Sequence, residues 1–279
     1  MVRLCQGDPI IVPTNHLDNF MLQPETLKQV LDNHKGNVSC LIFCNPCNPS
    51  GSVPSKDHLL SLVAVLDQHP DVIVVSDEIY ERILFDNVTH CSFGSISDIR
   101  HRTVVINGPS KAFAMTGYRI GFSVAPLSIA KAIAKLQSQI TSCASSIAQH
   151  ATAAAYTKVP QSWNDDTVLS LKRKRDLTLD LLRQIPGLSC ASPQGAFYLF
   201  PKVSNYFGKK FRSDGGSKEI IIDNSYTFCK ELLKEYQVAL VPGEAFGMEN
   251  NVRICFAANE STLVQSMRRL KKFILSLYD

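Results

Sequence analysis

Two segments carry side chains suited to amine and acid–base chemistry, and each follows an apolar run. Lys111 has small and apolar neighbours within the segment 107–121, which would keep water away from its amine. Such an amine is a candidate for a Schiff base with a carbonyl compound, although a partly exposed surface lysine is the ordinary interpretation of any single Lys. Asp77 follows the apolar run 72–75, where a carboxylate is unfavourable unless it meets a cation such as a protonated ring nitrogen. One helical turn would bring Tyr80 to the same side.

Four further side chains could hold anions or polar oxygens. Asn48, in the proline-rich turn 45–51, would present its amide at a strand's carboxyl end, where it could donate to a phenolate-type oxygen. Arg119 and Ser110 could together bind a phosphate dianion through a planar guanidinium and a hydroxyl. Arg253 lies within the apolar run 252–256, so we expect it to bind an anion, with a substrate carboxylate and a structural salt bridge as the alternatives.

The nine cysteines are spread singly except for Cys44 and Cys47, which form a C-x-x-C. That spacing could mark a redox pair or half of a zinc site. A second Cys or His pair at ligand spacing is missing, so we predict no metal. Reduced, mostly buried thiols in an intracellular compartment are the expectation.

Composition excludes several classes of protein. The chain has 279 residues, 45% hydrophobic and 19% charged, with a net charge of +4, which fits a globular protein with a sizeable core. The basic run Lys172–Arg175 is interpreted as the solvated face of a helix, and we predict no nucleic-acid binding. No run approaches the roughly 18 apolar residues of a membrane span. The N-terminus shows no leader, so the chain as given is expected to be cytoplasmic, with organelle targeting of a longer form left open.

Apolar runs alternate with helical stripes through the first half. Between Lys56 and His69 the apolar residues follow the i, i+3, i+4, i+7 spacing of a helix. Continuous apolar strands separated by helices indicate a mostly parallel sheet covered on both faces. The strands are predicted at 40–45, 72–76, 103–107 and 119–125, and the helices at 56–69 and 128–140.

The pattern changes after Val159-Pro160, where a long polar-rich helix is predicted. Mixed elements follow it, which predicts a three-layer α/β/α large domain at 1–160. Residues 161–279 would form the connecting helix and a smaller α+β C-terminal domain. The helices are predicted at 167–185, 225–236 and 260–278, and the strands at 195–201, 238–241 and 252–256.

Taken in order, Asn-Pro-x-Gly, Asp-x-x-Tyr, Ser-Lys and Arg-x-x-Phe resemble the class I aminotransferases, which have fold type I and depend on pyridoxal phosphate. The likeness covers nearly the whole chain and is strongest to aspartate/prephenate aminotransferases of the prokaryotic-like subgroup. Met1–Leu4, Ser145–Gln149 and Pro193–Phe200 carry that closer likeness.

The resemblance implies a role for each candidate residue. Lys111 would bind the cofactor covalently and move the substrate proton, and Asp77 would pair with the pyridinium nitrogen. Tyr80 and Asn48 would hydrogen-bond the phenolic oxygen of the ring. The remaining implied roles are cofactor phosphate binding by Ser110 and Arg119, and substrate carboxylate binding by Arg253 and Asn48. The implied reaction moves an amino group between an amino acid, expected to be aspartate or glutamate, and a 2-oxo acid.

Three departures from the family pattern remain. Ser50 replaces the usual Thr, and Tyr118 replaces the usual Trp. Family members also carry a long segment before the point that matches Met1, so the large sheet is expected to expose an apolar edge and face. A β-eliminating lyase or decarboxylase remains an alternative. So does a catalytically impaired fragment acting only as a dimerising or regulatory homologue. The full-length form is expected to be a homodimer.

Overall fold

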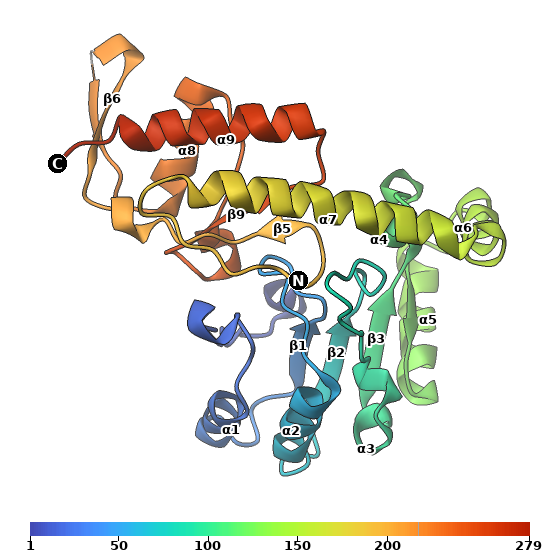
Figure 1. Ribbon diagram of the computed structural model, residues 1–279. Coiled ribbons are helices and arrows are strands. Elements are labelled where there is room, and N and C mark those ends of the chain that lie inside the picture. Colours follow the sequence, from blue (N-terminus) through green and yellow to red (C-terminus); the bar gives the residue numbers. More distant parts are fainter. Residues whose placement is uncertain (217) are drawn as a thin grey trace.

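A computed structural model describes residues 1–216 and 218–279, and its first half is built on a four-stranded sheet (Figure 1). The strand order is β1-β2-β3-β4, with β1 (Cys40–Cys44), β2 (Ile73–Asp77) and β3 (Thr103–Asn107) parallel to one another. The short β4 (Phe122–Val124) runs antiparallel to β3. The predicted mostly parallel sheet is thus confirmed, and the carboxyl ends of β1 to β3 meet at one edge.

Helices cover one face of this sheet. Buried side chains of α1 (Pro24–Asn33) and α2 (Lys56–Leu66) pack against the strands in one apolar cluster, to which α3 (Ser97–Arg100) adds a buried isoleucine. The α2 helix begins where predicted because the Ser55 hydroxyl accepts a hydrogen bond from the backbone N–H of His58. The fully buried members of this cluster include Leu27, Leu59, Leu62, Leu66, Val74, Phe93 and Ile99.

The opposite face of the sheet is open. Ile42 is 55% exposed and Ile106 is 40% exposed, and no residue of α5 (Leu127–Ile140) is buried. The apolar strands indicated cover on both faces, and that expectation is wrong for this face. The expectation that the sheet exposes an apolar edge and face is confirmed.

The connecting helix α7 (Gln161–Arg183) follows α6 (Ser146–Lys158) and runs along the boundary between the two halves (Figure 1). It begins six residues earlier than predicted, because Trp163 in its first turn stacks on Phe113 and so gives the polar N-terminal turns an anchor. The basic run on α7 is not wholly solvated. Arg175 is only 4% exposed and pairs with Asp86, which corrects the prediction of a solvated face.

The second half has its own closed core. A three-stranded antiparallel sheet of order β5-β9-β8 packs against α8 (Ser225–Tyr236) and α9 (Glu260–Leu275). Its strands are β5 (Tyr198–Leu199), β8 (Val241–Pro242) and β9 (Val252–Cys255). A separate antiparallel hairpin is formed by β6 (Lys210–Ser213) and β7 (Lys218–Ile221). Tyr80, Ile83 and Phe85 from the first half also join this core, so the division at residue 160 stays a prediction.

Several elements differ from the prediction. Of the strand predicted at 195–201, only β5 forms, and of the strand predicted at 238–241, only Val241 belongs to a strand, β8. Both β5 and β8 are limited to the residues that pair with β9. Helices α1 and α6 and the β6–β7 hairpin were not predicted. Within the described residues, no helix is both long and apolar enough to cross a membrane. Short 3-10 turns lie at Val2–Cys5, His16–Asp18, Phe93–Ser95, Thr116–Tyr118, Ser204–Tyr206, Asp214–Gly216 and Gly243–Phe246.

Candidate active site

The predicted site residues begin at the shared carboxyl edge of β1, β2 and β3. Cys44 is paired in register with Asp77, which is paired in turn with Ile106. The backbone N–H of Asn45 donates to the Asp77 carbonyl at 2.9 Å, and that of Glu78 donates to the Ile106 carbonyl at 2.9 Å. The turns that carry Asn48, Tyr80 and Lys111 therefore leave the sheet side by side.

The turn after β1 is fixed against the second half of the chain through Gly51. Its φ is +70°, and a Cβ there would lie 2.3 Å from Pro193 Cβ and 2.7 Å from the Gly195 carbonyl oxygen. The Gly51 carbonyl accepts hydrogen bonds from the N–H groups of Gln194 and Gly195, each at 2.9 Å. Only glycine satisfies both the left-handed backbone and this close approach.

Tyr80 is buried and in contact with Tyr198, a residue far away in the sequence. The two phenolic oxygens lie 2.8 Å apart, and the rings meet edge to face. Burial, followed by the hydrogen bond to Tyr198, raises the pKa of Tyr80. Burial also raises the pKa of Tyr198, so both phenols are neutral near pH 7 and able to donate.

Arg253 on β9 faces the turn after β1. It donates a hydrogen bond to Asn48 Oδ1 at 2.9 Å, and its guanidinium lies 4.5 Å from the Tyr198 ring centroid and 5.1 Å from that of Phe246. Its Nε is buried without a hydrogen-bond partner, and among the described residues Arg253 forms no ion pair. A structural salt bridge is therefore not what holds Arg253, and an unused buried donor suits an incoming carboxylate.

Lys111 lies on α4 (Pro109–Ala112), a single helical turn that begins directly after β3. Its Nζ is 6.0 Å from the Tyr80 ring centroid and 5.7 Å from the Phe197 ring centroid. Asp77, half-buried at the end of β2, accepts the Ile79 N–H on Oδ1 at 3.2 Å. The amine and the carboxylate thus lie on neighbouring strand ends of one site.

Ser110 and Arg119, the residues predicted to bind the cofactor phosphate, are not joined to each other in the structure. Ser110 is half-buried on α4, whereas Arg119 is exposed and donates to the Thr116 carbonyl at 3.0 Å. Arg119 lies outside the strand predicted at 119–125, because it takes a left-handed conformation with φ of 52° before β4 begins. No hydrogen bond among the described residues joins Arg119 to Ser110, so their shared role stays a prediction.

Three aromatic residues of the site were not predicted to have a role there. Phe197 and Tyr198 were included in a predicted strand, and Phe246 was not singled out. Each of these rings lies beside a cationic side chain: Tyr198 and Phe246 beside Arg253, and Phe197 beside Lys111. Aromatic faces attract cations, but the sequence alone gives no signal of which faces the cations will meet.

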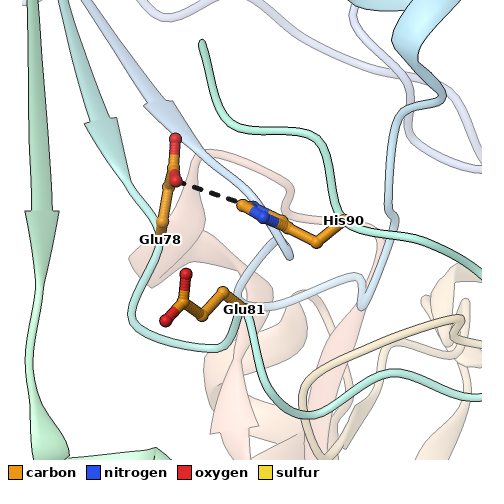
Figure 2. A group of neighbouring side chains, drawn as sticks. All are labelled: Glu78, Glu81 and His90. Carbon is orange, nitrogen blue, oxygen red and sulfur yellow. Dashed lines mark ion pairs between the residues drawn. The ribbon is translucent and has the colours of Figure 1, made fainter. Parts of the chain in front are cut away.

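Behind this edge, Glu78, Glu81 and His90 form a cluster of possible metal ligands, with one ligand atom of each within 4.8 Å of the others (Figure 2). Glu78 is buried, accepts hydrogen bonds from Ser76 and Ser92 at 2.8 Å each, and lies 3.7 Å from His90. Burial raises the pKa of Glu78, and the two serine hydrogen bonds oppose that shift. Since side chains alternate along the chain, this engaged carboxylate faces away from the site that Asp77 faces.

The thiols are less buried than the sequence analysis expected. Among the nine cysteines only Cys229 is buried, and four are exposed: Cys5, Cys40, Cys143 and Cys255. Cys44 and Cys47 are half-buried at the site edge. The expectation of mostly buried thiols is therefore wrong. Cys40 lies on the open face of β1, because it shares that face with the exposed Ile42.

A lysine, a strand-end carboxylate and a half-buried arginine thus lie at one edge of the sheet near two buried phenols, an arrangement suited to amino-group chemistry on a carboxylate-bearing substrate. Comparison with known proteins agrees with this class. Residues 1–270 match the family model of class I and II aminotransferases. The chain therefore belongs to the class I and II aminotransferase family.

Relatives and solved structures give the same result. The chain is 39% identical to an aspartate aminotransferase from Pinus pinaster, over 99% of this chain and 55% of that protein. It is 40% identical to a bifunctional aspartate aminotransferase and glutamate/aspartate-prephenate aminotransferase from Petunia hybrida, over 99% of this chain and 57% of that protein. A crystal structure of the aspartate aminotransferase from Rhizobium meliloti superposes with a TM-score of 0.91 at 34% identity, covering 99% of this chain and 67% of that one. The chain thus spans just over half the length of these two plant relatives.

Proposed function

We propose that this protein is a pyridoxal-phosphate-dependent aminotransferase that moves an amino group between aspartate or glutamate and a 2-oxo acid. The observation that carries the proposal is Arg253, whose buried Nε has no partner while its NH1 is held by Asn48. A guanidinium fixed in this way is ready to bind the α-carboxylate that amino acids and 2-oxo acids share.

The residues at the strand ends fit pyridoxal phosphate. The Lys111 amine can bind its aldehyde, and Asp77 can hold a proton on its ring nitrogen as a paired carboxylate. Tyr80 and Asn48 supply groups for its phenolic oxygen, and Ser110 and Arg119 are the candidates for its phosphate. When bound, pyridoxal phosphate supplies an electron-withdrawing ring that acidifies the Cα–H of an attached amino acid.

This chain's own residues would then control one proton. Lys111 lies at the carboxyl edge of the sheet and is the candidate base. Its amine can take the proton from the substrate Cα and return it to another carbon. Phe197 and Tyr80 border the Lys111 amine, which limits water access to it. Arg253 and Asn48 would fix the substrate carboxylate, so that the Cα–H bond points towards Lys111.

Cofactor binding can be tested without substrate. Adding pyridoxal phosphate should produce an absorbance band above that of the free cofactor, and borohydride should then fix a pyridoxyl group on Lys111, located by peptide mass spectrometry. Lys111→Ala should show no fixed group, with Lys131→Ala on α5 as the matched control. A pyridoxyl group that remains on another lysine in Lys111→Ala with undiminished yield would refute the assignment.

The reaction can be tested by its products. With aspartate and 2-oxoglutarate we expect oxaloacetate and glutamate in equal amounts. Arg253→Lys should raise KM for aspartate more than it lowers kcat, because a point charge cannot replace a bidentate grip. Pyruvate or ammonia in place of oxaloacetate would support the lyase or decarboxylase alternative. If the chain binds no pyridoxal phosphate, the result would support the other alternative, a catalytically impaired fragment that acts only as a dimerising or regulatory homologue.

A further inference from the structure

Tyr198 on β5 contacts two residues to which the proposed function gives different roles. Its hydroxyl oxygen lies 2.8 Å from that of Tyr80, and the Arg253 guanidinium lies 4.5 Å from the centroid of its ring. Tyr198 is only 6% exposed, and its backbone pairs in register with Cys255 on β9, two residues beyond Arg253. One buried side chain therefore joins the residue expected to meet the cofactor ring to the residue expected to meet the substrate.

The two buried hydroxyls of Tyr80 and Tyr198 share one hydrogen bond. Among the described residues, neither phenolic oxygen has a second hydrogen-bond partner. Each hydroxyl carries a single proton, so the phenol that donates to the other leaves the proton of its partner unused. The direction of this bond thus decides which of the two phenols can donate to a third group.

The surroundings of the two rings indicate that Tyr198 is the donor. The Arg253 guanidinium at 4.5 Å draws electron density from the Tyr198 ring, which makes its hydroxyl the stronger donor, whereas the Lys111 amine is 6.0 Å from the Tyr80 ring centroid. Burial raises the pKa of both phenols, but their shared hydrogen bond raises the pKa of Tyr80 further and lowers that of Tyr198. The other titratable groups near the pair are the thiols of Cys44 and Cys255.

We propose that Tyr198 is a positioning residue for both the cofactor and the substrate. Its hydroxyl donates to Tyr80, which leaves the Tyr80 proton for the phenolic oxygen of pyridoxal phosphate. A hydroxyl that accepts one hydrogen bond donates a stronger one, so Tyr198 also strengthens the donation from Tyr80. The Tyr198 ring holds the Arg253 guanidinium by a cation–π contact that needs no anion, which leaves the buried Nε of Arg253 for a substrate carboxylate. This inference rests on the proposed function.

The hydrogen bond itself is tested on protein without cofactor. Urea unfolding is measured for Tyr80→Phe, for Tyr198→Phe and for the double variant. We expect the double variant to lose less stability than the sum of the two single losses, because each single change already breaks the shared bond. Losses that add fully would mean that the two hydroxyls do not interact in the folded protein, and would overturn the proposal.

The role of the hydroxyl is tested by the absorbance of bound pyridoxal phosphate as a function of pH. A donor to the phenolic oxygen stabilises its negative charge, and so lowers the pH at which the linkage to Lys111 loses its proton. Tyr198→Phe should therefore raise the midpoint of the absorbance change by about half a pH unit, and Tyr80→Phe should raise it by more. KM for aspartate should stay within about twofold of the wild type in Tyr198→Phe, because the ring beside Arg253 remains.

The matched control is Tyr206→Phe. It removes a hydroxyl that donates to the Pro186 carbonyl elsewhere in the C-terminal core, from a ring as buried as that of Tyr198. The control should leave the absorbance midpoint unchanged. An unshifted midpoint in Tyr198→Phe, or an equal shift in Tyr206→Phe, overturns the role of the Tyr198 hydroxyl.

The role of the ring is tested with Tyr198→Leu. Loss of the cation–π contact should raise KM for aspartate about fivefold, with a smaller effect on kcat. An unchanged KM overturns the role of the ring. If Tyr198→Leu does not fold, Tyr198→Phe still decides the proposal, because a raised KM without a shifted midpoint contradicts it. Wild-type protein that binds no pyridoxal phosphate overturns the proposed function and both roles with it, while the unfolding measurements still decide the hydrogen bond.

Discussion

The C-terminal core and the four-stranded sheet differ in how completely their apolar surfaces are covered. In the C-terminal core, α8 and α9 contribute the fully buried rings of Phe228 and Phe273, which meet edge to face at 5.1 Å between centroids. In the sheet, one face packs on α1 and α2, while the other leaves Ile42 and Ile106 exposed. One half of the chain closes on itself, and the other has an apolar face without a covering layer.

This difference bears on the site because the site lies between the two halves. Arg253 and Tyr198 come from the closed core, whereas Asp77 and Lys111 come from the end of the open sheet. The proposed substrate-binding residues are thus held by well-packed elements. The proposed cofactor-binding residues depend on strands whose second face is bare, and the exposed Arg119, proposed to bind the cofactor phosphate, fits that pattern.

The largest expected effect is a cavity in the closed core. Phe228→Ala should lower the free energy of unfolding by about 3–5 kcal/mol, because a fully buried ring is removed. The control is Tyr226→Ala on the same helix, where the ring is exposed and the change should stay within about 0.5 kcal/mol. Urea denaturation followed by circular dichroism measures both. Equal losses in the two variants would contradict a closed core at α8.

A second variant tests the contact between the two halves. Gly51→Ala should destabilise the protein by at least about 2 kcal/mol, because the left-handed backbone disfavours a Cβ and Pro193 and Gly195 leave no room for one. Gly208→Ala is the matched control, since its φ is +86° and nothing lies within 4 Å of its added Cβ. It should lose only about 1 kcal/mol, from backbone strain alone. If thermal and urea unfolding give the two variants equal stability, the close approach at Gly51 contributes nothing.

A third variant tests the ion pair between α7 and the first half. Hydrogen bonds from Arg175 and then Lys172 lower the pKa of Asp86 from 3.8 to about 2. Because this pKa is depressed in the folded state, the ionised Asp86 carboxylate stabilises the folded protein above pH 3.8. That stabilisation is lost as the pH falls towards 2. Asp86 is 44% exposed, so Asp86→Asn should cost less than about 1 kcal/mol at pH 7.

The difference in free energy of unfolding between the wild type and Asp86→Asn should become smaller as unfolding is measured at successively lower pH. Asp180→Asn, which removes an exposed pair with Arg183 on the same helix, should show no such trend. A difference for Asp86→Asn that stays constant with pH would rule out ionisation of Asp86 as its source.

The smallest expected effect on stability is on the open side. Leu136→Glu combined with Ile140→Glu on α5 should change the free energy of unfolding by no more than about 0.5 kcal/mol, because both side chains are exposed. The pair should nevertheless reduce binding of an apolar dye and self-association in sedimentation velocity, because it breaks up an exposed apolar patch. Leu275→Glu, at the exposed end of α9, should leave both readouts unchanged. A large loss of stability in the α5 variant would mean that this face is covered.

Elements with strong local signals were predicted almost to the residue. The end residues of α8 match the prediction, because Asn224 caps its first turn through Thr227 and an apolar stripe follows. The end residues of β3 also match. Strands β5 and β8 were predicted poorly because each is a two-residue element that exists only where it pairs with β9. Whether a short strand forms depends on its partner's position, which local sequence does not specify.

The sequence by itself determined the chemistry of the site: an amine at Lys111, a carboxylate at Asp77 and a guanidinium at Arg253. The strands at Asp77 and Arg253 were predicted, whereas the short helix α4 that carries Lys111 was not. Tertiary structure decided which side chains these groups meet. Asn48 and Arg253 are 205 residues apart in the chain, and Tyr80 and Tyr198 are 118 apart, yet each pair is within hydrogen-bonding distance. Tertiary structure likewise left one face of the sheet open. Local propensity acts over a few residues, whereas these contacts and this exposure depend on how whole layers pack.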